Sequence, residues 1–221
     1  LMSMDPEAIA SNNTKSTTSP LKEALSQDID GLMTKIIKWR HHFHQYPELG
    51  NREFKTSKYI AELLTDLGLE VNTGIAYTGL TAYIRGDHPG PLMALRADID
   101  GLPVTEMTNL PFASIETTQY QGNEVGVMHA CGHDAHIAVL LGVADFLSRN
   151  TDKLHGDILL IFQPAEEGPP EGEEGGAELM LKEGIFDERP DVVFGMHVTN
   201  SYNGAIAVKA GPAMASAEAF R

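Results

Sequence analysis

Residues 91–98 read PLMALRAD, and residues 156–163 read GDILLIFQ. Both runs are apolar at nearly every position until polar residues end them. Continuous apolar runs of this length are typical of strands that are covered on both faces, whereas a strand with one wet face alternates. The two runs therefore predict the centre of an α/β sheet with helices on both faces.

The patterns around these two runs predict the other elements. Apolar residues recur at helical spacing after Ser19-Pro20, which predicts a helix from there to about His44. Further helices are expected over about 53–67 and 133–147, and a short one in GAELMLKEG (176–184). Other strands are expected in LEVNT (69–73), LTAYIRG (80–86), DVVFGMHV (191–198) and GAIAVKA (204–210), with an irregular excursion over 103–127. The predicted fold is α/β, with a mixed, mostly parallel sheet.

Charge and composition exclude several classes of protein. Lys and Arg number 16 and Asp and Glu 31, a net charge of −15, which argues against nucleic acid or an anionic membrane as a partner. A single cysteine excludes an intramolecular disulfide. The sequence has no apolar run long enough to span a membrane and no signal-peptide pattern at its start. We therefore predict a cytoplasmic location, with a periplasmic or secreted location after signal removal as the alternative.

Unusual polar residues follow three of the predicted strands. Asp98 and Asp100 come after PLMAL, Glu166 and Glu167 after ILLIF, and His197 after VVFGM. In open α/β sheets, ligands bind beyond the carboxyl ends of the strands. We therefore expect these groups to converge on one site.

The chain's only cysteine lies in VMHACGHDAHIAVLL (127–141), where an apolar helix is expected to begin. Thiolate and imidazole, here Cys131 and His133, suit zinc and similar divalent metals. The spacing fits three readings equally well: a buried inert thiol, a catalytic thiol paired with histidine, or part of a metal site. His136 lies one turn beyond His133 and is left without a role.

The two adjacent carboxylates can divide two tasks. Glu167 can hold a metal while Glu166 takes a proton from water that the metal has acidified. A solvated acidic turn is the alternative, and that reading is the one we adopt for Glu173-Glu174. His197 also fits a buried core histidine, and Asp98 and Asp100 also fit turn residues. The histidines at positions 41, 42 and 44 are read as a polar helix face.

Taken together, the residues predict four metal ligands, Cys131, His133, Glu167 and His197, with Glu166 as the base. This set is sufficient for one metal ion and too small for two, because a binuclear site needs a bridging ligand and several terminal ones.

Six segments also carry a family resemblance. HHFHQYPELGNREFKTS, LRADIDGLPVTE, MHACGHDAH, IFQPAEEG, EGGAELMLKEG and FGMHV occur in this order. They resemble the N-terminal half of the aminoacylase, hippurate hydrolase and indole-acetyl-amino-acid hydrolase family. This is the cysteine-containing branch of the carboxypeptidase-G-like amidohydrolases.

The resemblance implies roles for individual residues. Cys131 would bridge two divalent ions, zinc or manganese, with nickel or cobalt as alternatives. His133 and His197 would be terminal ligands on one ion and Glu167 on the other. Glu166 would be the general base, and Asp98 the carboxylate that supports the cluster. Arg96 occupies the position at which other branches of the family have a histidine ligand. This fits a ligand role for His133 in its place.

The resemblance also implies a domain organisation. Residues 1–19 are expected to be a disordered lead-in, and 20–210 the N-terminal part of a metallo-exopeptidase-like catalytic domain. Residues 211–221 would begin a lid and dimerisation domain. The rest of such a protein, with the last metal-ligand histidine, does not occur in this sequence. We therefore expect a homodimer for the full-length protein and little activity for this chain alone.

The function predicted is hydrolysis of the amide bond of a small N-acyl-amino acid by metal-activated water with Glu166 as base. A dipeptidase, carboxypeptidase or desuccinylase of the same superfamily is the nearest alternative. Two other classes stay open at this point: a hydrolase that uses the Cys131 thiol as nucleophile, and a non-catalytic metal-binding protein.

Overall fold

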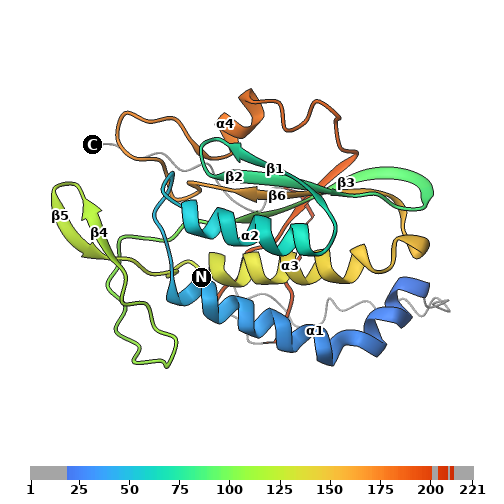
Figure 1. Cartoon of the computed structure of the whole chain (residues 1–221), viewed down its shortest axis with the longest axis horizontal. Coiled ribbons are helices and arrows are strands. Elements are labelled where there is room, and N and C mark those ends of the chain that lie inside the picture. Colours follow the sequence, from blue (N-terminus) through green and yellow to red (C-terminus); the bar gives the residue numbers. More distant parts are fainter. Residues whose placement is uncertain (1–18, 201–203, 209, 212–221) are drawn as a thin grey trace.

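The structure, a computed structural model, describes residues 19–200, 204–208 and 210–211. The predicted lead-in (apart from Ser19) and residues 212–221 of the predicted lid junction lie outside these residues. The described part holds a five-stranded sheet with helices on both faces and a separate two-stranded hairpin (Figure 1). This confirms the predicted fold class.

The helices come close to the predicted limits. They are α1 (Pro20–Gln45), α2 (Phe54–Asp66), α3 (His133–Ser148) and the short α4 (Gly176–Lys182), with a 3₁₀ turn at Thr151–Lys153. Ser19 caps α1, because its hydroxyl accepts a hydrogen bond from the Lys22 amide at 3.4 Å. None of the helices in the described residues is both long and apolar enough to cross a membrane.

The central sheet has the order β1-β2-β6-β3-β7. Its strands are β1 (Glu70–Ile75), β2 (Gly79–Ile84), β3 (His88–Asp98), β6 (His155–Gln163) and β7 (Val192–Gly195). β6 pairs with β3, and β3 with β7, in parallel, whereas β2 is antiparallel to both β1 and β6. Four of the five strands therefore point the same way, and β3 and β6 lie inside the sheet.

The two apolar runs bury both of their faces. In β6, Ile158, Leu160 and Phe162 join a core under α2 and α3, while Leu159 and Ile161 join a second core that includes Met180 of α4. Figure 1 shows α1, α2 and α3 on one side of the sheet and α4 on the other. Strands without a wet face explain why the sequence shows no alternation there.

Two expectations about the strands are wrong. The excursion 103–127 is not wholly irregular, because it contains the hairpin β4 (Thr117–Tyr120) and β5 (Asn123–Gly126). Its turn, Gln121-Gly122, has positive φ at both residues, as such hairpins require. The strand expected over 204–210 is also absent: residues 204–208 and 210 are not in a strand, and 209 lies outside the described residues.

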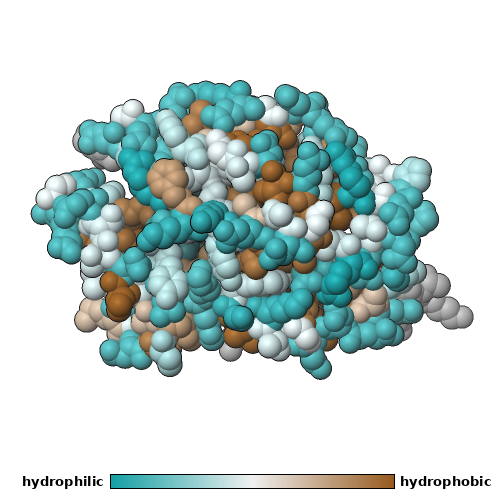
Figure 2. All heavy atoms as spheres, in the orientation of Figure 1, coloured by the Kyte–Doolittle hydropathy of each residue, from teal (hydrophilic) through white to brown (hydrophobic). Residues whose placement is uncertain are grey.

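The exposed surface is mainly polar on the face drawn in Figure 2, where hydrophilic atoms surround hydrophobic ones in the region of the sheet. At the opposite end of the sheet order from β1, β7 pairs with a strand on one side only among the described residues, and Val192, Val193 and Phe194 are exposed there.

Candidate metal centre

The predicted site residues converge at the carboxyl edge of the sheet. Asp98 ends β3, Glu166 and Glu167 follow β6, and His197 follows β7. His133 opens α3, whose N-terminus faces the same edge, and Cys131 precedes it by two residues. The parallel pairing of β6, β3 and β7 therefore brings together segments that are far apart in the sequence.

His133 lies at the centre of this cluster. Its Nδ1 is 2.9 Å from the Asp100 carbonyl oxygen and 3.1 Å from Asp100 Oδ1, so this nitrogen is placed to donate a proton. Its Nε2 is buried and has no hydrogen-bond partner in the described part of the chain. That nitrogen lies 3.6 Å from an oxygen of Asp98, 3.6 Å from one of Glu166 and 3.8 Å from one of Glu167.

This arrangement fits a cation. The buried Nε2 faces carboxylate oxygens at 3.6–3.8 Å, beyond hydrogen-bond distance, and a cation between them would bind both the nitrogen and the oxygens. A metal-bound histidine usually binds the ion through one ring nitrogen and donates a hydrogen bond from the other to a carboxylate or carbonyl oxygen. The residues present therefore fit a divalent metal.

Three groups of side chains in the described residues could each hold an ion, and all three contain His133. They are Cys131, His133 and His197; Asp98, His133 and His136; and His133, Glu166 and Glu167. In the first group, Cys131 Sγ lies 3.3 Å from His197 Nε2. The structure thus brings every predicted ligand and the predicted base into one cluster.

The Cys131 thiol is held in its protonated form by its surroundings. Burial and the neighbouring carboxylates, Glu167 first among them, raise the pKa of Cys131 to about 12. A nucleophilic thiol needs the opposite, a lowered pKa beside a cationic group. The environment therefore disfavours the thiol-hydrolase alternative. It fits a sulfur that would lose its proton on binding a metal ion.

His136, which the sequence left without a role, links two parts of the cluster. Its Nδ1 lies 2.6 Å from Asp98 Oδ1, and its Nε2 accepts a hydrogen bond of 2.9 Å from the Val198 amide, next to His197. Burial alone would raise the pKa of Asp98, but the hydrogen bond from His136 and the charge of Arg96 lower it to about 2.

Asp100 is a second residue whose position the sequence did not decide. Besides holding His133, its Oδ2 accepts a hydrogen bond of 2.9 Å from the Glu167 amide. One buried carboxylate therefore orients two of the predicted metal ligands. The only sequence signal for it was its place in the run of charges after β3.

Gly132 allows these segments to approach each other. It has φ of 92°, in the left-handed region, and a Cβ at this position would lie 2.3 Å from Val198 Cγ2. The left-handed backbone and the close Val198 side chain both favour glycine between Cys131 and His133.

The interpretation of one upstream histidine is wrong. The sequence places His44 with His41 and His42 on a polar helix face, but the structure shows that His44 is only 4% exposed. Its Nδ1 is 2.9 Å from Asp134 Oδ2 and its Nε2 is 3.1 Å from Glu106 Oε1. The excursion that carries Glu106 covers this end of α1, which the spacing along α1 could not reveal.

The pattern of this chain matches a known family. The model of "Peptidase family M20/M25/M40" matches residues 94–216, which contain all six predicted site residues. The chain belongs to this family. The resemblance noted from the six sequence segments is thereby confirmed.

Relatives within the M20 family have names that fit the predicted chemistry. The chain is 46% identical over 203 residues to "Thermostable carboxypeptidase 1" of Saccharolobus solfataricus, covering 91% of this chain and 49% of the relative. It is 39% identical over 200 residues to "N-acyl-L-amino acid amidohydrolase" of Geobacillus stearothermophilus, covering 90% and 50%. The chain spans about half the length of the curated relatives it matches.

A solved structure of the family also resembles this chain. The YXEP protein of Bacillus subtilis, described as a dinuclear metal binding peptidase from the M20 family, is 38% identical, with a TM-score of 0.68. The match covers 78% of this chain and 45% of that protein.

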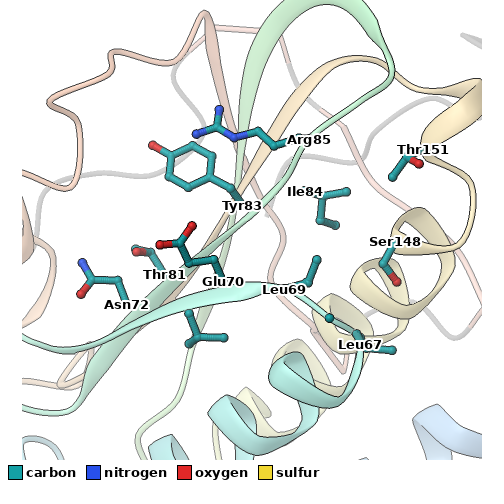
Figure 3. A pocket seen from close by; sticks show the side chains of 12 residues that line it. Leu67, Leu69, Glu70, Asn72, Thr81, Tyr83, Ile84, Arg85, Ser148 and Thr151 are labelled. Carbon is teal, nitrogen blue, oxygen red and sulfur yellow. The ribbon is translucent and has the colours of Figure 1, made fainter.

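A large surface cavity lies elsewhere in this M20 chain, beside β1, β2 and the ends of α2 and α3 (Figure 3). Its charged lining residues are Glu70 and Arg85, and it contains no member of the His133 cluster. The Arg85 guanidinium lies over the Tyr83 ring, 4.1 Å from its centroid. The candidate functional site is therefore the cluster at the sheet edge.

Proposed function

We propose that this chain provides the metal-binding and proton-transferring part of a hydrolase that cleaves the amide bond of N-acyl-amino acids. The observation that carries the proposal is His133 Nε2, which is buried, without a hydrogen-bond partner in the described residues, and faced by three carboxylates. The name of the amidohydrolase relative supports the substrate class.

The residues that would hold two divalent ions are Cys131, His133, Glu167 and His197. Zinc or manganese is the expected metal, with nickel or cobalt as alternatives; the dinuclear relative supports the number of ions. Such ions, when bound, lower the pKa of water to about 7 and polarise a carbonyl group. Asp98 supports the set through its bond to His136.

Glu166 is the proposed general base. Its side chain is 37% exposed, so it can reach both the cluster and a substrate, and its Oε2 lies 3.6 Å from His133 Nε2. The carboxylate takes a proton from the attacking water and delivers it to the leaving amine. Its neighbour Glu167 is oriented by Asp100 and is therefore suited to a ligand's role.

Replacement of the base tests the proposal. In the intact protein, Glu166→Gln should lower kcat on N-acetyl-amino acids about 10²–10⁴-fold while the bound metal stays as in wild type. Glu178→Gln, an exposed glutamate on α4, is the matched control and should keep full activity. Near-wild-type turnover in Glu166→Gln would refute the assignment. Stoichiometric metal without amidase activity in the wild type would favour the non-catalytic alternative.

A carboxypeptidase is a second candidate, because one relative with that name is 46% identical. The chemistry and the base would be the same, and only the acyl side of the substrate would differ. Comparing kcat/KM for N-acetyl-amino acids with kcat/KM for N-blocked dipeptides decides between them. The homodimer and the cytoplasmic location stay predictions.

A further inference from the structure

The turn formed by residues 50–53 reaches the loop that carries Glu166 and Glu167. Gly50 packs against this loop so closely that a Cβ would lie 2.8 Å from the Gly168 carbonyl oxygen and 3.1 Å from Ala165 Cα. Contacts under 3.0 Å are not tolerated without movement, so glycine is required here. The turn and the loop are therefore packed backbone against backbone.

The next two residues of the turn hold the far end of the same loop. Asn51 is fully buried and donates hydrogen bonds to the Glu174 carbonyl oxygen at 2.9 Å and to Glu173 Oε2 at 3.1 Å. Arg52 pairs with both carboxylate oxygens of Glu173, at 2.5 and 3.1 Å. The acidic pair that looked like a solvated turn thus anchors the loop to the turn.

Glu53 holds the near end of the loop. Its side chain is fully buried, its Oε1 accepts a hydrogen bond of 2.8 Å from the Ala165 amide, and its Oε2 accepts one of 2.5 Å from the Thr78 hydroxyl. Ala165 has φ of 47°, a left-handed conformation that residues other than glycine seldom adopt. A strained residue persists only when its surroundings fix it, and Glu53 provides such a bond directly before Glu166.

We propose that the 50–53 turn is a clamp on the loop 165–175, and that Glu53 is a positioning residue for Glu166. The amide of Ala165 is held by Glu53 and the amide of Glu167 by Asp100, so Glu166 lies between two fixed points. This fixes the direction in which the proposed base projects. The proposal rests on the proposed function only through the role given to Glu166.

Glutamine should replace Glu53 with little loss. Burial raises the pKa of Glu53, and the hydrogen bonds from Thr78 and Ala165 lower it. Burial has the larger effect, so the pKa is raised to about 7. A neutral side chain is therefore readily accommodated at this position. The amide oxygen of glutamine can accept the Ala165 bond, and its NH₂ can donate to the Thr78 oxygen.

The test compares Glu53→Gln and Glu53→Ala in the intact, metal-loaded protein. Glu53→Ala should lower kcat about tenfold to hundredfold with KM within about twofold, because a displaced base slows the chemical step. Amide exchange over residues 165–168 should accelerate at least about tenfold as the hydrogen bond is lost. Glu53→Gln should restore both values to within about threefold. Glu62→Ala, at an exposed site on α2, the helix that follows the turn, is the control.

Two results would overturn the proposal: unchanged exchange and kcat in Glu53→Ala, or equal damage in Glu53→Gln. If Glu53→Ala does not fold, Gly50→Ala disturbs the packing of the same turn against Gly168 and Ala165 and should lower kcat at constant KM. An unchanged kcat would overturn the clamp. Amide exchange does not depend on amidase activity. Amide exchange would therefore still test the clamp if the Glu166→Gln experiment refuted the proposed function.

Discussion

At the scale of single residues, the cluster depends on groups that would not touch a metal. His136 joins the Asp98 carboxylate to the Val198 amide, and Asp100 joins His133 to the Glu167 amide. Each of these bonds crosses between segments more than thirty residues apart. The proposed ligands are therefore oriented by hydrogen bonds made in tertiary structure.

His136→Leu should weaken metal binding about 10–100-fold, the usual cost of losing a partner that orients metal ligands. The substitution frees Asp98 Oδ1 and leaves the Val198 amide without its acceptor, so His197 is held less firmly. Titration of the metal-free protein with Zn²⁺ measures the effect. His155→Gln, an exposed histidine at the start of β6, is the control. Zinc affinity equal to wild type would show that His136 does not orient the site.

The residues of the cluster could be predicted from the sequence, but the hydrogen bonds that connect them could not. Cys131, His133, Glu166 and His197 stood out because each follows a strand or opens a helix with an unusual group. The role of His136 depends on a backbone amide of a distant segment, for which no residue type is a signal. Spacing could therefore reveal which groups gather, and only geometry could reveal which group orients which.

At the scale of elements, the excursion 103–127 is fastened to α1 and α3 through His44. This side chain lies between Asp134 of α3 and Glu106 of the excursion, and Arg40 also contacts Asp134, with its Nε 3.1 Å from Asp134 Oδ2. Glu106 in turn accepts a hydrogen bond of 2.6 Å from the Ser114 amide. One histidine thus joins two helices to the excursion.

This contact should make stability depend on pH. The hydrogen bond to Asp134, with that to Glu106, raises the pKa of His44 against the opposing effect of burial. The stabilisation is complete below the unfolded-state pKa, about 6.5, and is lost as the pH rises through the raised folded-state value. The contribution of His44 to stability should therefore be smaller in mildly alkaline than in mildly acidic solution.

His44→Gln removes the titrating group and measures that contribution. The variant should be destabilised by about 1.5–3 kcal/mol near pH 6, the range for hydrogen bonds to charged groups, and by less near pH 9. Urea unfolding at both values gives the difference, and His88→Gln, an exposed histidine, is the control. A destabilisation that is the same at both pH values would contradict the role of the charged imidazole.

The elements were predictable where their own side chains determine them. α1 follows from an apolar stripe and the Ser19 cap, and β3 and β6 from apolar runs of strand length. The hairpin β4–β5 was missed because its exposed, polar strands lack apolar alternation and its turn is Gln-Gly rather than Asn-Gly. Residues 204–210 are mostly apolar, which led to the prediction of a strand. A strand also needs a neighbouring strand to pair with, and apolar content does not show whether one is present.

At the scale of the whole molecule, the sheet brings four negatively charged or ligating segments to one edge. Asp98, Asp100, Glu166 and Glu167 lie there around His133, in a chain whose net charge is already −15. Like charges held together destabilise the folded state unless a cation compensates them. The fold and the metal should therefore be linked thermodynamically.

Metal removal should lower the melting temperature of the intact protein. A metal ion at a hundred times its dissociation constant stabilises the folded state by about 2.7 kcal/mol, which corresponds to about 5–10 °C for a domain of this size. Glu167→Gln should reduce the metal-dependent rise to less than half, because it removes a proposed ligand charge. Glu178→Gln carries the same change of charge on exposed α4 and should keep the full rise. Calorimetry with chelator and with added Zn²⁺ or Mn²⁺ measures the rise in each variant. An equal rise in Glu167→Gln and wild type would mean that the ion which stabilises the fold binds outside the His133 cluster.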